Sequence, residues 1–178
     1  DENNWTVRKD VRNVRVMGSG TGGMRGFNNE WMTITGGGFG PEIGIGHYVG
    51  QFTDAPVMVL KSCIGNRALG WDLLRTGSEG FECKDNKGVS WVHPGYKGSP
   101  ERWVKGTDPK KINWYAGMQY DGDTARAKKV LSELDQYYPG AKSYEIAGFF
   151  WWQGDRDSRS QALSNRYEKN LVHLIKQL

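Results

Sequence analysis

Runs of apolar residues predict three strands in this chain. Valines alternate with polar residues over residues 13–17, which indicates a short strand. Residues 57–60 and 144–152 form two further apolar runs, as expected of strands that are buried on both faces of a parallel sheet. The glycine-rich residues 18–23 cannot continue the first strand, so we expect a loop there.

Apolar residues at helical spacing predict three helices. One has its apolar residues at positions i, i+3, i+4 and i+7, with Asp123 as the expected N-cap and Pro139 with Gly140 as the stop. An earlier helix is expected to start at Pro41, and its three glycines indicate close packing against a neighbour. The closing helix carries an apolar stripe formed by Tyr167, Leu171, Leu174, Ile175 and Leu178.

The order of strands and helices predicts an α/β fold with parallel strands and right-handed crossovers. A length of 178 residues suits a single domain spanning residues 1–178. Glycine and proline interrupt the pattern between about residues 75 and 113, so we expect a loop-rich insertion there, with at most a hairpin around residues 86–88. Because Leu178 still belongs to the apolar stripe, we expect the sequence to continue beyond it.

Composition excludes several classes of function. The net charge of +4 is small, and the basic residues form no long run, which argues against a nucleic-acid partner. No stretch of 18 apolar residues occurs, so no membrane span is predicted. The 25 glycines indicate that much of the function lies on loops. Cys63 and Cys83 are equally compatible with a disulfide and with two buried thiols.

Candidate chemistry lies where two of the predicted strands end, because ligands of open α/β sheets bind outside the carboxyl ends of the strands. Gly65 and Asn66 follow the strand at residues 57–60, and Gln153 and Gly154 follow the strand at residues 144–152. At each place a glycine allows close approach of the backbone NH, and a side-chain amide can donate to a developing negative charge. The alternative is that the glycines only turn the chain and that the amides cap neighbouring helices.

Several sequence blocks resemble the SGNH hydrolases, in particular those similar to sialate O-acetylesterases and acetylxylan esterases. Residues 146–155, IAGFFWWQGD, are similar to the W-x-Q-G-E/D block of that group, and residues 59–66, VLKSCIGN, resemble the strand and glycine turn before it. Residues 38–42 and 167–171 also resemble intermediate segments. The resemblance implies a three-layer α/β/α, flavodoxin-like fold with a doubly wound parallel sheet, incomplete in this chain. It also implies an enzyme that removes acetyl groups from sugars through a serine nucleophile.

The resemblance also implies roles for individual residues. The backbone NH of Gly65 and the amide of Gln153, with Asn66 and Gly154 beside them, are the oxyanion-hole candidates. Asp155 matches the acidic position after Gln-Gly, where it holds loops together or touches substrate. The other candidates for substrate binding are Arg67, Trp152 and Trp91. For the aromatic residues around the insertion, sugar contact and ordinary packing are about equally good interpretations.

The catalytic serine and histidine of that family are not found. No G-Q-S-N or G-D-S motif occurs, and no histidine follows an aspartate at the D-x-x-H spacing, since the residues three positions before the histidines are Gly44, Ser90 and Asn170. We therefore expect the central part of a longer enzyme, with its nucleophile and its Asp/His pair outside this chain, and a chain that is inactive alone. A secreted or periplasmic location is implied by the polysaccharide substrate.

Other interpretations are weaker but distinct. A non-catalytic carbohydrate-binding domain on the same scaffold, or a structural α/β protein, fits the same pattern. Asp155 and Asp157 with Asp72 or Glu42 could form a carboxylate pair for glycoside hydrolysis. Asp155 and Asp157 alone could belong to a calcium loop, but its glycine and distal glutamate are absent, and solvated loop carboxylates are the preferred interpretation. His47 has no second ligand at metal spacing, and the sequence predicts no metal and no cofactor.

Overall fold

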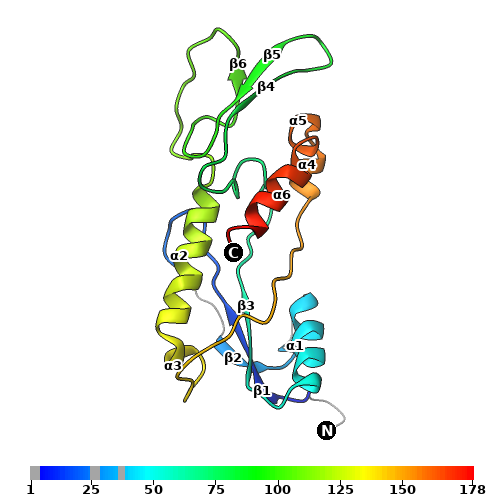
Figure 1. The fold of residues 1–178 in the computed structure, drawn as a ribbon, viewed down its shortest axis with the longest axis vertical. Coiled ribbons are helices and arrows are strands. Elements are labelled where there is room, and N and C mark those ends of the chain that lie inside the picture. Colours follow the sequence, from blue (N-terminus) through cyan, green and yellow to red (C-terminus); the bar gives the residue numbers. More distant parts are fainter. Residues whose placement is uncertain (1–4, 25–28, 36–38) are drawn as a thin grey trace. The chain divides into compact units, whose positions relative to one another are not determined.

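The computed structural model describes residues 5–24, 29–35 and 39–178 of the chain. These residues form a mixed α/β structure with two three-stranded sheets and six helices (Figure 1). The chain divides into two compact units, each assembled from segments that are distant in sequence. The first unit comprises Asp1–Gly18, Gly23–Cys63 and Ala125–Ala147, and the second comprises Ser19–Gly22, Ile64–Thr124 and Gly148–Leu178.

The first unit is built on a sheet with the strand order β2-β1-β3. The central strand β1 (Arg8–Arg15) pairs in antiparallel fashion with β2 (Asn29–Met32) and in parallel fashion with β3 (Val57–Lys61). Val11 is the partner of Val57, and Arg15 is the partner of Lys61, so the two parallel strands run in register over five residues. This is the one parallel pair of strands in the described part of the chain.

Each face of this sheet is covered by a different part of the unit. Helix α1 (Pro41–Phe52) approaches one face so closely that a Cβ at Gly46 would overlap the side chain of Met32. Its first turn is tied to β3 by an ion pair of 2.8 Å between buried Glu42 and Lys61. A hydrophobic cluster lies on the other face and contains Val14, Val16, Val130 and Tyr137, with Met24, Met58 and Leu60 packed against it.

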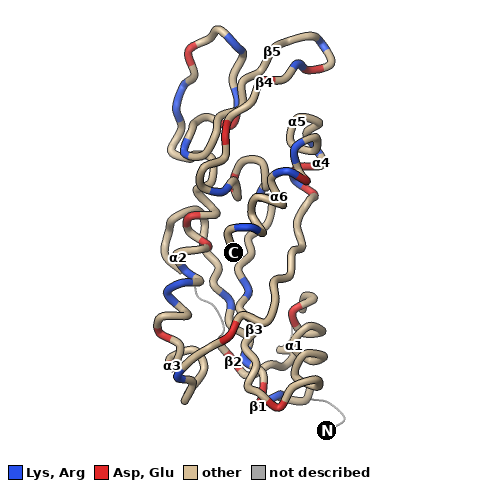
Figure 2. The backbone as a smooth tube through the Cα atoms, viewed as in Figure 1, with Lys and Arg blue, Asp and Glu red and all other residues tan. Residues whose placement is uncertain are grey.

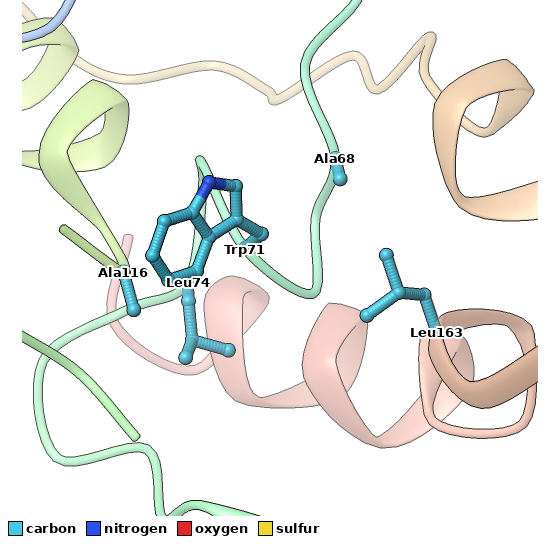
Figure 3. Packing of buried hydrophobic residues seen from close by; sticks show 5 residues of the cluster. All are labelled: Ala68, Trp71, Leu74, Ala116 and Leu163. Carbon is cyan, nitrogen blue, oxygen red and sulfur yellow. The ribbon is translucent and has the colours of Figure 1, made fainter. Parts of the chain in front are cut away.

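The second unit combines a small antiparallel sheet with short helices. Its strands are β4 (Phe81–Lys84), β5 (Ser90–His93) and β6 (Trp103–Val104), and its helices α4 (Asp155–Ser158), α5 (Gln161–Ser164) and α6 (Tyr167–Ile175) follow late in the chain. Helix α2 (Met118–Ser132) begins in this unit, continues into the first at Ala125 and is followed there by α3 (Leu134–Tyr137). The core of the second unit is a cluster of five buried residues (Figure 3), namely Ala68, Trp71, Leu74, Ala116 and Leu163.

Several elements confirm the sequence-based expectations. The α/β class, the strand that contains residues 13–15, the turns within residues 18–23, the helix that starts at Pro41 and the hairpin around residues 86–88 are all present. The strand at residues 57–60 is confirmed as β3, but the expectation that it is buried on both faces is wrong. Every residue of β3 is partly exposed, because β3 lies at an edge of its sheet.

The predicted strand at residues 144–152 is not formed. These residues have no regular secondary structure, and Ile146, Phe150 and Trp152 are 67%, 65% and 87% exposed. An apolar run predicts a strand only when a neighbouring strand offers hydrogen bonds to its backbone, and no described residue pairs with this segment. Figure 1 shows it as the irregular orange trace that leads to α4.

Two predicted helices differ from the structure at their ends. Helix α2 begins at Met118, so Asp123 lies within it and accepts a hydrogen bond of 2.9 Å from the Gln119 side chain instead of capping the helix. The closing helix α6 ends at Ile175 with Lys176 as its C-cap, so Leu178 does not belong to its stripe and is 58% exposed. At the start of α2 the backbone NH groups of Gln119 and Tyr120 donate to the backbone oxygen of Asp72, a tertiary contact that local sequence does not reveal.

Gly117 is expected to tolerate no side chain. It has a φ of 92°, and a Cβ there would overlap the backbone oxygen of Leu74. Gly106 has a similar φ of 87° but open space around it. Gly106→Ala should therefore cost about 1–2 kcal/mol of backbone strain, and Gly117→Ala should cost about 1–3 kcal/mol more, in the free energy of unfolding measured with urea. Equal costs would contradict the close packing described at Gly117.

Stability is expected to fall as the pH falls from 6.5 toward about 4, because of His93. Burial, and to a lesser degree the charges of Arg102 and Arg166, lower the pKa of His93 from 6.5 to about 4. Between these values the unfolded chain binds a proton that the folded chain does not, so this contribution is complete above pH 6.5 and is lost below it. The free energy of unfolding should be lower near pH 4 than near pH 7, and His93→Phe should reduce this difference. An unchanged difference would show that His93 does not cause it.

Candidate functional site

Both segments singled out in the sequence line one pocket, although only the first of them follows a strand in the structure. Residues 64–67 form one side of it and residues 151–156 form the other, and both segments belong to the second unit. The pocket is open to solvent and has a volume of about 540 Å³, within the size range of small-molecule sites in general. The oxyanion-hole and substrate-binding candidates all line it except Trp91.

The two segments are joined by the carboxylate of Asp157, which is 1% exposed. Its Oδ2 atom accepts a hydrogen bond of 2.8 Å from the backbone NH of Leu69, and its Oδ1 atom accepts one of 2.9 Å from Gly70. The same Oδ2 accepts a third bond, of 2.7 Å, from the Gln153 side chain. The interpretation of Asp157 as a solvated loop carboxylate is therefore wrong, since it is buried and bridges residues 88 apart in sequence.

The side-chain amide of Gln153 donates hydrogen bonds to both parts of the chain that Asp157 joins. Its Nε2 atom donates 2.8 Å to the backbone oxygen of Arg67 and 2.7 Å to Asp157. Both amide hydrogens are thus used within the protein, and to donate to a ligand Gln153 would have to exchange one of these bonds. Its buried Oε1 atom has no hydrogen-bond partner among the described residues.

Gly65 and Asn66 are the open side of the pocket. Both residues are exposed, and a Cβ at Gly65 would meet no atom within 4 Å. Within the described part of the chain, neither the backbone NH of Gly65 nor the amide of Asn66 has a hydrogen-bond partner. Asn66 adopts a φ of 58°, a left-handed conformation in which asparagine is among the favoured residues. These two residues therefore present free donors to a ligand.

Arg67 contributes its backbone to the pocket and directs its guanidinium group elsewhere. The guanidinium carbon lies 4.7 Å from the ring centre of Trp114. Its NH2 atom donates 3.0 Å to the hydroxyl of Ser19, and its Nε atom donates 3.3 Å to Gln119. Because these partners hold the side chain, the geometry favours a positioning contribution from Arg67 over direct contact with a substrate.

Residues 151–156, on the other side of the pocket, include both exposed side chains and side chains that are held by hydrogen bonds. Trp152 is 87% exposed, and Asp155 is exposed with Arg159 as its ion-pair partner at 2.7 Å. By contrast, the Trp151 indole donates 2.8 Å to the hydroxyl of Tyr167, which in turn donates to the backbone oxygen of Gln153. Trp151 is therefore held in place, whereas Trp152 is free to contact a ligand.

The remaining sequence candidates lie away from this pocket. Trp91 is on β5, where its indole donates 3.0 Å to Asp85, and it does not line the pocket. Asp72 accepts a bond of 2.8 Å from the Ala68 NH, and burial raises its pKa. Glu42 belongs to the first unit, where it pairs with Lys61, and exposed His47 lies on α1. Cys63 and Cys83 are both free thiols.

Sequence reasoning missed the structural roles of Asp157 and Tyr167. The sequence pattern assigned Tyr167 to an apolar stripe, but its hydroxyl connects Trp151 to Gln153. Asp157 stands four positions after Gln153, which in a helix would bring their side chains together. Its backbone partners, Leu69 and Gly70, have no signal in the sequence, because a bond from a backbone NH does not depend on the residue type.

Removal of the Asp157 carboxylate should be far more costly than removal of its neighbour. Asp157→Ala leaves two backbone donors and the Gln153 amide without an acceptor, and should lower the free energy of unfolding by about 3 kcal/mol or more. Asp155→Ala breaks only an exposed ion pair and should change it by no more than about 0.5 kcal/mol. Urea unfolding of both variants makes the comparison, and equal effects would contradict the bridging role.

Comparisons with known proteins assign no family to this chain. No model of a protein family, no curated protein and no solved structure matches it. Among the described residues no three or more His, Cys, Asp or Glu side chains are placed to hold a metal ion. No helix in that part of the chain has both the length and the apolar character needed to cross a membrane.

Proposed function

We propose that the pocket binds an acetylated carbohydrate and that the protein is a serine hydrolase of the carbohydrate O-acetylesterase type. The observation that carries the proposal is that residues 64–67, which follow β3, and residues 151–156 line one pocket, with the Asp157 carboxylate bonded to both parts of the chain. The order of these segments in the chain is the one in which the sequence resembles SGNH hydrolases. A three-layer α/β/α sheet and a secreted or periplasmic location belong to the same proposal.

The free donors suit the pocket to an oxyanion function. Hydrolysis of an ester places negative charge on the carbonyl oxygen, and preorganised NH groups stabilise that charge. The backbone NH of Gly65 and the Asn66 amide are exposed and have no partner among the described residues, so they can serve in this way without breaking a bond. Gln153 fixes the opposite wall through Arg67 and Asp157, which keeps the two sides of the pocket at a constant separation.

Acyl transfer also requires a nucleophile and a base. The described residues that line the pocket include neither serine nor histidine. Because the sequence also lacks the serine motif and the D-x-x-H motif of the SGNH hydrolases, the proposed reaction takes its serine and its Asp/His pair from outside residues 1–178, and these 178 residues alone are expected to be inactive. The part played by this chain is to bind the sugar and to stabilise the oxyanion.

A non-catalytic carbohydrate-binding domain is the second candidate. It is favoured by the same pocket lining, whose described residues include an exposed tryptophan but no nucleophile. An indole ring stacks on the apolar face of a sugar. On this interpretation Trp152 would bind the ligand, and Gly65 and Asn66 would donate hydrogen bonds to its hydroxyl or acetyl oxygens.

The two functions are separated by the release of acetate. The full-length protein should release acetate from acetylated xylan and from 4-nitrophenyl acetate if it is the proposed esterase. Asn66→Ala in that protein should lower kcat while leaving KM nearly unchanged, because an oxyanion donor acts in the transition state. Retained binding of acetylated xylan with no acetate released would favour the binding domain.

Trp152 should contribute to binding under either function. Trp152→Ala should weaken the binding of acetylated xylan oligosaccharides about five- to tenfold, as measured by isothermal titration calorimetry. Phe150→Ala provides the matched control, since Phe150 is also exposed, at 65%, but does not line the pocket. Equal weakening by both substitutions would place the sugar elsewhere on the exposed segment.

A further inference from the structure

The β4–β5 hairpin of the second unit carries a cationic face that lies apart from the pocket. Phe81 pairs with His93 across the two strands, and Cys83 pairs with Trp91. Alternate residues of a strand point to the same side, so these four side chains share one face of the hairpin. Phe81 and His93 are stacked there, with ring centres 4.6 Å apart and planes within 5°.

Two arginines lie on the rings of this face. The guanidinium carbon of Arg166 is 4.4 Å from the ring centre of Phe81, and that of Arg102 is 4.5 Å from the ring centre of Trp91. Phe81 and Trp91 are diagonal neighbours in the antiparallel ladder, which places them about 7–8 Å apart. The two cations therefore stand over adjacent positions of the same face.

Stacking leaves the hydrogen-bonding edges of both arginines available. A guanidinium group that rests on an aromatic ring uses its flat face, while its NH donors point outward in the plane. Within the described part of the chain, neither Arg102 nor Arg166 forms an ion pair or a side-chain hydrogen bond. Arg102 is exposed and Arg166 is partly exposed, so solvent reaches both.

The nearby carboxylates are committed to other partners. Glu101 pairs with Arg156 at 3.4 Å, and Glu82 pairs with Lys105 at 2.6 Å. Asp85 accepts bonds from the Trp91 indole and from the backbone NH groups of residues 87 and 89. The charge of the two arginines is thus not neutralised by a paired carboxylate among the described residues. Figure 2 shows that basic and acidic residues are otherwise interspersed along the chain.

His93 is a buried residue of this face that feels the charge of both arginines. Its side chain is 3% exposed, and its Nε2 atom has no hydrogen-bond partner among the described residues. The two charges that act on it, those of Arg102 and Arg166, are both positive, and with burial they lower its pKa to about 4. The imidazole is therefore neutral near pH 7 and adds no cation, so the face attracts anions through the two arginines alone.

We propose that this face of the β4–β5 hairpin binds the carboxylate or sulfate groups of an acidic polysaccharide. Arginine is suited to such groups because its fork of NH donors matches two oxygens of one planar or tetrahedral anion. Two arginines on adjacent positions can engage neighbouring anionic groups of one chain, which a single small anion cannot do. The polysaccharide class rests on the proposed function, whereas the binding of an anion does not.

Binding to polysaccharides of different charge tests the proposal. The protein should bind polygalacturonate and dextran sulfate, and should bind the neutral polymers xylan and dextran much more weakly at this face. Arg102→Gln and Arg166→Gln should each weaken binding to the two polyanions by about tenfold or more, and the corresponding lysine variants should lose less. Lys105→Gln removes one positive charge that is paired with Glu82 of β4, and should change binding less than about twofold.

Because a variant can lose binding by failing to fold, a second measurement uses the unsubstituted protein. The Nε–H signals of Arg102 and Arg166 in nitrogen-15 NMR spectra should shift when polygalacturonate is added. Unchanged signals, or equal weakening by the glutamine variants and Lys105→Gln, would overturn the proposal. Equal affinity per charge for inorganic sulfate and for dextran sulfate would overturn the polysaccharide as ligand. Because these polymers carry no acetyl ester, a failure here is distinct from a failure to release acetate.

Discussion

The buried carboxylate of Asp157 is the contact on which the candidate site depends. It satisfies two backbone NH groups at residues 69 and 70 and one amide hydrogen of Gln153, all with distances between 2.7 and 2.9 Å. A buried carboxylate is stable only when its oxygens accept several hydrogen bonds. The chain therefore cannot separate the segment after β3 from the segment before α4 without exposing or orphaning this charge.

This constraint divides the polar groups of the pocket into two kinds. Gln153, Tyr167 and the backbone of Arg67 are engaged with one another and form the supporting wall. Gly65 and Asn66 make no such bonds with the described residues and face solvent. A site of this kind needs both, because free donors act on a ligand only when rigid neighbours hold them in position.

Sequence reasoning located the segments of the pocket but not the bonds that join them. The glycine turn after residues 57–60 and the Gln-Gly pair at residues 153–154 were found because local composition marks the end of an element. The backbone partners of Asp157 could not be found, since they lie 87 and 88 residues away in sequence. The strand at residues 144–152 was predicted wrongly for a related reason, because apolar character does not reveal whether a neighbouring strand is present.

The cationic face of the β4–β5 hairpin is a second feature that could not be predicted from the sequence. Arg102 and Arg166 are unremarkable in the sequence, where each stands alone among uncharged or oppositely charged neighbours. Only the ladder between β4 and β5 brings Phe81 and Trp91 to one side, and only the stacking distances show that both rings carry a guanidinium group. A local concentration of positive charge can therefore arise in a chain whose net charge is small.

The exposed segment at residues 144–152 also has a consequence for the behaviour of the protein in concentrated solution. It contains four aromatic residues that are each about half exposed or more, at positions 144, 149, 150 and 152. Glu145 is its only charged residue. A run of this composition, whose backbone pairs with none of the described strands, is a template for pairing between molecules. Solubility and resistance to aggregation should therefore be governed by this segment more than by the overall surface charge.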